Sequence, residues 1–134
     1  MKIQKPPRLS RAFGRLSPGA LCEPFSVTTT FPGHRSTLVA VVGDIDLATV
    51  AILVECAETA LKTGGPLVVD LGEVTFCSGA GLRALHQVQR YADDAAVPVA
   101  WVVRTPAVWR LLRGTGGAGF SCYRDRADAL AAVG

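Results

Sequence analysis

The sequence predicts an α/β protein with one domain, in which a mixed, mostly parallel sheet of about five strands packs against about four helices. Two observations carry this prediction. Segments typical of strands and of helices alternate along the chain from residue 24 onward, and short joints between parallel strands and helices require right-handed crossovers. The chain of 134 residues is 49% hydrophobic and 19% charged, which supplies enough apolar side chains for one sizeable core.

The first half of the folded segment is predicted to contain two strands and a helix. Residues 25–31, FSVTTTF, are rich in β-branched side chains and predict an edge strand. The more apolar run STLVAVVG, at 36–43, predicts a second strand. A helix follows, with Asp46 as its N-cap and Gly64 and Gly65 as its stop. Its buried face is predicted to carry Val50, Val54, Ala57 and Leu61.

The second half of the chain continues the alternation. Continuous apolar runs at 66–71 and 97–103 have the pattern of central parallel strands. The helix between them is predicted to bury Leu82, Leu85, Val88 and Ala92. A third helix starts at Pro106, and the chain ends with a short strand at 120–123 and a last helix at 126–133.

Basic charge is concentrated at the start of the chain. The formal net charge is +3, yet residues 1–23 hold five basic side chains against a single acidic one, whereas the remainder holds nine against ten. We therefore predict a basic, loosely ordered N-terminal extension over 1–23 and a nearly neutral folded domain over 24–134. A neutral domain lacks the basic face on which binding to duplex nucleic acid depends, so no direct nucleic-acid partner is predicted.

The sequence predicts neither a membrane span nor a metal site. Its most apolar stretch ends at Arg104, far short of the roughly 18 residues that a span needs. The cysteines stand far apart and form no CxxC pair: Cys22, Cys56, Cys77 and Cys122. This spacing is not that of a zinc site. Reduced thiols are typical of the cytoplasm, which is the predicted location, and the oligomeric state stays open.

The second predicted helix opens with four of the smallest side chains, the run Ser-Gly-Ala-Gly at 78–81. Each glycine in a first helical turn costs roughly 1 kcal/mol relative to alanine, so the run needs a physical reason. Tight packing of the helix on its strand is one interpretation. Close approach of a partner to the open helix N-terminus is the other.

Three segments of the chain resemble the STAS domains of bacterial anti-sigma factor antagonists: GDIDLATV at 43–50, VVDLGEVTFCSGAGLRAL at 68–85 and PAVWRLLRGTG at 106–116. The resemblance extends over residues 24–134. Such domains have a Gly-acidic-aliphatic-Asp segment before the first helix. This chain matches that segment with Gly43, Asp44, Ile45 and Asp46. The fold that the resemblance implies is a STAS-like single α/β domain.

The run that opens the second helix follows the family only in part. In these domains it reads Asp-Ser-small-Gly-Leu, and Ala80, Gly81 and Leu82 match the last three positions. Ser78 stands in place of the aspartate and Gly79 in place of the serine. That serine is the family's switch: the unmodified antagonist binds an anti-sigma factor that is also a serine kinase, and a phosphate of about −2 charge ends the binding.

Because Gly79 has no hydroxyl, the resemblance implies the fold and a protein-binding role, but not regulation at that atom. Ser78 has two interpretations: its oxygen caps the helix, or it is a displaced phosphoacceptor. The resemblance places partner binding on two neighbouring stretches. The predicted binding residues are Gly43, Asp44, Asp46, Ser78, Gly79, Ala80, Gly81 and Leu82.

The implied function is that of a regulatory protein without catalysis and without a cofactor, which binds an anti-sigma factor of the serine-kinase type and so frees a sigma factor. One alternative is a non-phosphorylatable STAS scaffold subunit of a signalling or transport complex, in which Gly79 is natural. Another is a nucleotide-binding protein built on the run GTGGAG at 114–119. That run ends a helix, whereas a dinucleotide fingerprint opens one.

Two further side chains have open interpretations. Trp109 lies at the margin of the third predicted helix, where it is either half-buried or anchors a partner, whereas Trp101 is predicted to belong to the core. Cys77, beside the start of the second helix, is either a redox-sensitive thiol or a buried, inert cysteine.

Overall fold

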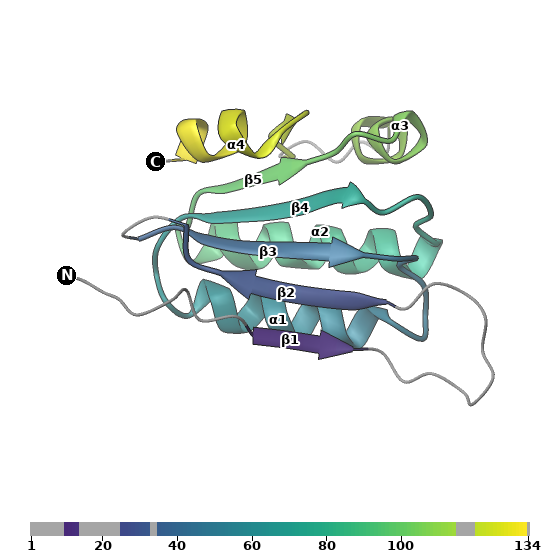
Figure 1. Cartoon of the computed structure of the whole chain (residues 1–134), viewed down its shortest axis with the longest axis horizontal. Coiled ribbons are helices and arrows are strands. Elements are labelled where there is room, and N and C mark those ends of the chain that lie inside the picture. Colours follow the sequence, from purple (N-terminus) through teal and green to yellow (C-terminus); the bar gives the residue numbers. More distant parts are fainter. Residues whose placement is uncertain (1–9, 14–24, 33–34, 115–119, 134) are drawn as a thin grey trace.

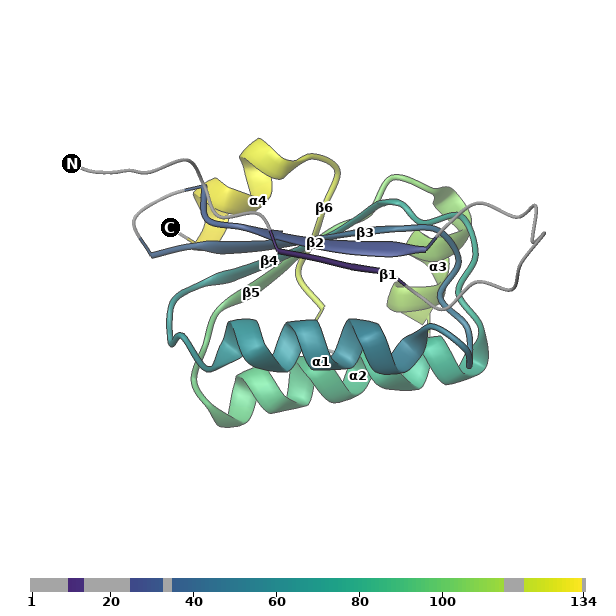
Figure 2. The same ribbon diagram turned by 60° about the horizontal axis from the view of Figure 1, so that its bottom comes forward.

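The computed structural model describes residues 10–13, 25–32, 35–114 and 120–133. They form a six-stranded sheet with helices on both of its faces (Figures 1 and 2). The elements in chain order are β1 (Ser10–Phe13), β2 (Ser26–Thr30), β3 (Thr37–Val42), α1 (Val50–Leu61), β4 (Leu67–Glu73), α2 (Gly79–Asp94), β5 (Val99–Val102), α3 (Pro106–Gly114), β6 (Cys122–Tyr123) and α4 (Arg126–Val133).

The strands lie in the sheet in their sequence order, β1 to β6. The pairs β1–β2 and β2–β3 are antiparallel, whereas β3–β4, β4–β5 and β5–β6 are parallel. The parallel pairs are joined through helices, as short crossovers require. The predicted α/β class, with a mixed and mostly parallel sheet and four helices, is confirmed.

Strand β1 corrects the prediction for the start of the chain. Residues 1–23 were expected to be loosely ordered, and 25–31 to form an edge strand. Instead, Ser10–Phe13 pairs antiparallel with β2, so β1 occupies the edge position and β2 is an inner strand. The four residues SRAF show no alternation of apolar side chains from which a strand is recognised. The other residues of the predicted extension lie outside the described part of the chain.

The helices form two layers around the sheet. Helices α1 and α2 lie side by side on one face, and α4 covers the opposite face over β4 and β5 (Figure 2). Helix α3 lies at the end of the sheet where the parallel strands finish (Figures 1 and 2). The carboxyl ends of β3, β4 and β5 therefore all point toward one edge of the molecule.

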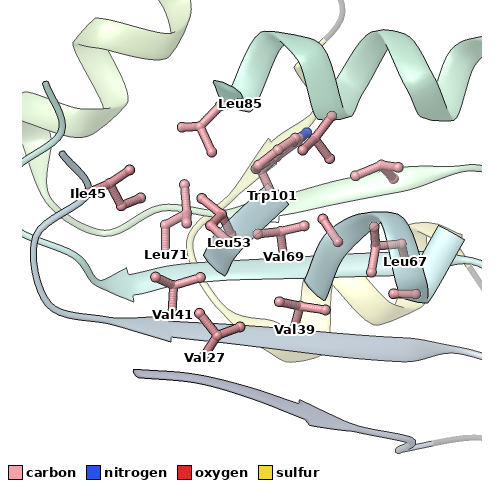
Figure 3. Packing of buried hydrophobic residues seen from close by; sticks show 14 of the residues in the cluster. Val27, Val39, Val41, Ile45, Leu53, Leu67, Val69, Leu71, Leu85 and Trp101 are labelled. Carbon is pink, nitrogen blue, oxygen red and sulfur yellow. The ribbon is translucent and has the colours of Figure 1, made fainter. Parts of the chain in front are cut away.

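The larger hydrophobic core fills the space between the sheet and the helices α1 and α2 (Figure 3). Trp101, Leu53 and Leu85 are completely buried there, and the Trp101 Nε1–H donates a hydrogen bond to Gln89 Oε1 at 2.7 Å. A smaller cluster beneath α4 takes the alternate residues of the same strands, such as Val68. Both faces of β4 are thus covered, which explains its continuous apolar sequence.

The buried stripes of the two long helices were predicted unequally well. In α2 the core residues Leu85, Val88 and Ala92 are buried as predicted, and Leu82 is half-buried. In α1 the predicted face was partly wrong, because Val50 and Val54 are only half-buried. The residues that α1 buries are Leu53, Ala57, Ala60 and Leu61. Helix α1 packs against both the sheet and α2, and this double contact selects a face rotated from the predicted one.

Candidate functional site

The two stretches predicted to bind a partner are joined by backbone hydrogen bonds. Ile45 and Cys77 form an isolated parallel β-bridge. The Ile45 N–H donates to the Phe76 carbonyl at 2.9 Å, and the Ser78 N–H donates to the Ile45 carbonyl at 2.8 Å. We call residues 43–47 and 75–82 together the corner. The structure therefore brings the predicted binding stretches into one surface, at the carboxyl ends of β3 and β4.

The first stretch of the corner is shaped by one glycine and one buried side chain. Gly43 has φ of 105°, a left-handed conformation that side chains rarely adopt, and it turns the chain out of β3. Ile45 is completely buried and lies at one end of the core (Figure 3). Asp44, between them, is exposed. The alternation anchors the loop while presenting a carboxylate to solvent.

Asp46 caps a turn, which corrects the prediction that it caps the helix. Helix α1 begins at Val50, with Thr49 at the N-cap position and no side-chain cap bond. Asp46 Oδ1 instead accepts hydrogen bonds from the N–H groups of Ala48 at 3.0 Å and Thr49 at 3.2 Å. Asp46 thus makes its capping hydrogen bonds three residues before the N-cap position of the helix, because a turn over 47–49 precedes the helix. Asp46 itself is half-buried.

Ser78 is the N-cap of α2, as the first of its two interpretations predicts. Its backbone is extended, with φ of −77° and ψ of 174°, and its Oγ accepts a hydrogen bond from the Gly81 N–H at 3.0 Å. This bond satisfies one of the amides that a helix N-terminus leaves unpaired. The hydroxyl of Ser78 is therefore engaged in holding the first turn of the helix.

The two glycines of the corner have different surroundings. Gly81 is buried, and a Cβ placed there would lie 2.6 Å from Ile45 Cγ2 and 2.9 Å from the Ile45 carbonyl oxygen. Gly79 is exposed, and a Cβ there would meet only Arg83 Nη1, at 3.9 Å. Packing accounts for Gly81 but not for Gly79. Ala80, between them, is half-buried.

Two exposed apolar side chains of the corner were not singled out from the sequence as binding residues. Leu47 is 79% exposed and Phe76 is 52% exposed. Neither side chain belongs to the core cluster. The sequence carried no clear signal for them, because Ile45 and Val74 lie in the same two loops and are completely buried. Leu47 and Phe76 give each of the two stretches of the corner one large exposed apolar side chain.

The charged groups of the corner are mainly acidic. Asp44 accepts a long hydrogen bond of 3.5 Å from Thr75 Oγ1, and Asp46 adds a second carboxylate; the exposed Glu73, at the end of β4, lies just outside the corner. Arg83 is the cation nearest to Gly79, one helical turn away. The exposed part of the corner thus combines apolar and acidic groups.

The Cys77 side chain matches the inert interpretation better than the redox-sensitive one. It is half-buried, and desolvation by burial raises the pKa of its thiol to about 11. The thiol is therefore protonated at neutral pH, whereas nucleophilic attack and oxidation need the thiolate.

Metal binding and membrane insertion find no support in the described residues. The described part of the chain holds no group of three or more His, Cys, Asp and Glu side chains placed to bind a metal ion. Of the helices that the structure describes, none has the length and apolar character to cross a membrane. The glycine run at 114–119 begins where α3 ends, at Gly114, and residues 115–119 lie outside the described part.

Comparison with known protein families decides the family of this chain. A family model described as "Mlab, STAS domain" matches residues 28–120. The chain belongs to the STAS domain family. Among solved structures, an anti-sigma factor antagonist from Mycobacterium paratuberculosis is 30% identical to this STAS domain, with a TM-score of 0.68. That match covers 80% of this chain and 93% of the mycobacterial chain.

Two other solved structures share the fold at lower identity. The Bacillus cell fate determinant SpoIIAA, in its phosphorylated form, is 13% identical with a TM-score of 0.63, over 81% of this STAS domain chain and 99% of SpoIIAA. The murine anion transporter Slc26a9 is 17% identical with a TM-score of 0.64, over 78% of this chain but only 18% of the transporter. The fold therefore also occurs as one part of a transporter chain. No curated protein matches the sequence.

Proposed function

We propose that this STAS domain is an anti-sigma factor antagonist, which binds an anti-sigma factor of the serine-kinase type through the corner and so frees a sigma factor. The observation that supports this most is the bridge between Ile45 and Cys77, because it holds the two stretches that family resemblance assigns to partner binding side by side. The similarity to the mycobacterial antagonist supports the same class. Catalysis forms no part of the proposal.

The chemistry of the corner indicates what kind of surface it binds. Leu47 and Phe76 supply exposed apolar area, and the carboxylates of Asp44 and Asp46 lie on the same loop as Leu47. Interfaces commonly combine an apolar centre with a polar rim. We therefore propose that the matching surface of the anti-sigma factor has an apolar patch bordered by lysine or arginine side chains.

The proposed regulation differs from that of a switchable antagonist. Residue 79 is exposed on the first turn of α2 and carries no hydroxyl, so a kinase partner finds no acceptor oxygen there. We expect the domain to stay in its binding-competent state. Ser78 stays the candidate for a displaced phosphoacceptor, although a phosphate on its Oγ would compete with the cap bond to Gly81.

The test is affinity capture from the native host with the immobilised domain, followed by calorimetric titration with the captured protein. We expect an anti-sigma factor in the eluate, and we expect Leu47→Asp to weaken its binding. The matched control is Phe31→Asp, which changes an apolar side chain of 44% exposure just beyond β2, at the opposite end of the sheet. Equal loss in both variants, or an eluate without an anti-sigma factor, would contradict the proposal.

A scaffold subunit of a signalling or transport complex is the second candidate. It is favoured by the open, hydroxyl-free position 79, because a permanent subunit needs no phosphorylation switch. In this case the same capture experiment yields a transporter or scaffold protein that stays bound in the presence of ATP. Nucleotide binding, the third interpretation, predicts a rise in melting temperature with ATP, GTP or a dinucleotide.

A further inference from the structure

The basic side chains of the folded domain are unevenly distributed. Of the nine that follow residue 23, five lie between residues 104 and 126, a stretch with a single acidic residue, Asp125. The five are Arg104, Arg110, Arg113, Arg124 and Arg126. The domain is therefore nearly neutral as a whole but has one basic region, the basic end, formed by α3 and by the segments that follow β5 and β6.

Trp109 belongs to this basic end, and two guanidinium groups lie over its ring. The Arg113 Cζ lies 5.8 Å from the centroid of the Trp109 ring, and the Arg124 Cζ lies 5.3 Å from it. Arg113 belongs to α3 and Arg124 follows β6, so two separate elements converge on one half-buried indole. An arginine stacked on an aromatic face is held in place while its in-plane N–H groups stay available for a carboxylate.

Two carboxylates beside these arginines, those of Asp70 and Asp125, are already engaged in the fold. Asp70 is 4% exposed and pairs with Arg126, which is the one ion pair among the described residues. Asp125 Oδ1 accepts a hydrogen bond from the Asp128 N–H at 2.8 Å, at the start of α4. Arg104, Arg113 and Arg124 thus have no carboxylate partner in the described part of the chain, and all three are exposed.

We propose that this basic patch, consisting of Arg104, Trp109, Arg113 and Arg124, docks an acidic segment of a partner protein. Charge complementarity selects the sign of that segment, since two guanidinium groups without a carboxylate partner lie over the indole and a third, that of Arg104, is bonded to the backbone of Arg124. Arg104 is oriented for this role, because its Nε–H donates to the Arg124 carbonyl at 3.1 Å. The forked guanidinium geometry suits carboxylates, which bind it in a bidentate manner.

The neighbourhood of the basic patch favours a short acidic segment over a nucleic acid. Thr105, at the start of α3, donates a hydrogen bond from Oγ1 to the Val74 carbonyl at 3.0 Å. The patch therefore adjoins the loop that follows Glu73, on the side of the acidic corner. A long polyanion that extended across this edge would meet the carboxylates of Asp44 and Asp46, whereas a short segment would not. The inference concerns a surface outside the corner and does not depend on the proposed function.

The test measures binding of a fluorescein-labelled oligoglutamate peptide by fluorescence anisotropy. We expect saturable binding to the wild type that weakens as salt is raised, and a loss of about tenfold or more in the double variant Arg113→Gln with Arg124→Gln. The matched control is Arg83→Gln with Arg90→Gln, which removes the same charge from the exposed face of α2. The control is expected to bind the peptide within about twofold of the wild type.

A second pair of variants keeps the test decisive if the double glutamine variant fails to fold. Arg113→Lys with Arg124→Lys retains the charge but removes the planar fork, and it is also expected to weaken peptide binding. Equal loss in the double glutamine variant of the patch and in the α2 control would show an effect of net charge alone and overturn the proposal. Absence of saturable binding, or tighter binding of a single-stranded oligonucleotide of the same charge, would overturn it as well.

Discussion

Gly79 and Gly81 stand two positions apart in the first turn of α2, yet Gly81 is buried against Ile45 whereas Gly79 is exposed and touches little. The same division runs through the whole corner. Gly43 and Ile45 are buried, while Leu47 projects into solvent. The geometry of the loop requires the buried residues, so substitutions there are expected to change the free energy of unfolding. The exposed ones are not required by packing, and this leaves them available for binding.

The largest effect is expected where a side chain is added to the buried half. Gly81→Val places a Cβ against the side chain and carbonyl of Ile45, so the loop must shift, and we expect a loss of about 3 kcal/mol in the free energy of unfolding. The matched variant Gly79→Ala adds its methyl to open space and is expected to gain up to roughly 1 kcal/mol from helix propensity. Urea unfolding measures both. A Gly81→Val protein as stable as the wild type would contradict the assignment of Gly81 to packing.

The next effect concerns docking and sharpens the role of the exposed half. Gly79→Asp adds a carboxylate at a helix N-terminus, one turn before Arg83, which the fold should tolerate. We expect it to weaken binding of the captured anti-sigma factor by about 2 kcal/mol, because the charge loses water in the interface. Calorimetric titration measures the affinity.

The control for Gly79→Asp is Gly79→Ser, which adds a hydroxyl without charge. Its affinity is expected to match the wild type until the kinase partner and ATP phosphorylate it, and phosphopeptide mapping should then find phosphate on residue 79 of that variant only. Stoichiometric phosphate on Ser78 of the wild type, with release of the partner, would show instead that the switch has moved by one residue.

A smaller effect separates the two aspartates of the first stretch. Asp46→Ala removes the acceptor of two backbone hydrogen bonds, and we expect a loss of about 1 kcal/mol in the free energy of unfolding. Asp44→Ala removes an exposed carboxylate with one long contact to Thr75, so its stability should stay within about 0.5 kcal/mol of the wild type. Thermal unfolding of both proteins compares them. Equal destabilisation would mean that Asp44 also supports the loop.

The smallest effect at neutral pH is expected from the Cys77 thiol. Because burial raises its pKa to about 11, alkylation by iodoacetamide at mildly basic pH should be about 100-fold slower than for a thiol of unshifted pKa. Because the folded state holds the thiol proton more tightly than the unfolded state, the raised pKa contributes to the free energy of unfolding while the thiol is protonated. This contribution is lost as pH rises from the pKa of the unfolded thiol toward 11. Mass spectrometry of alkylated peptides follows the reaction. Rapid labelling of Cys77 near neutral pH would contradict its burial.

The parts of the fold that were predictable are those in which burial repeats with one clear period. Helix α2 alternates arginines with an apolar stripe, so Leu85, Val88 and Ala92 were assigned correctly. Helix α1 begins with the run Val50–Val54, which is apolar on every side, so periodicity gave no unique face. Strand β1 depends on backbone pairing with β2, which its side chains do not encode.

The corner was predictable as a place but not in its division of roles. Family resemblance pointed to both stretches, and Ser78 was recognisable as a cap. Residue type does not distinguish Gly79 from Gly81; what distinguishes them is that Ile45 packs against Gly81 in the folded chain. Asp46 was placed at the wrong cap because a turn before a helix has the same capping preference as the helix itself.

The bridge between Ile45 and Cys77 extends the pairing of β3 and β4 beyond the strands themselves. A protein that docks on the corner therefore meets loops whose backbone is already ordered, and association requires little additional loss of conformational entropy there. Differences in affinity among variants of the corner's exposed side chains should consequently arise from the rate at which the complex dissociates, while the association rate stays nearly constant.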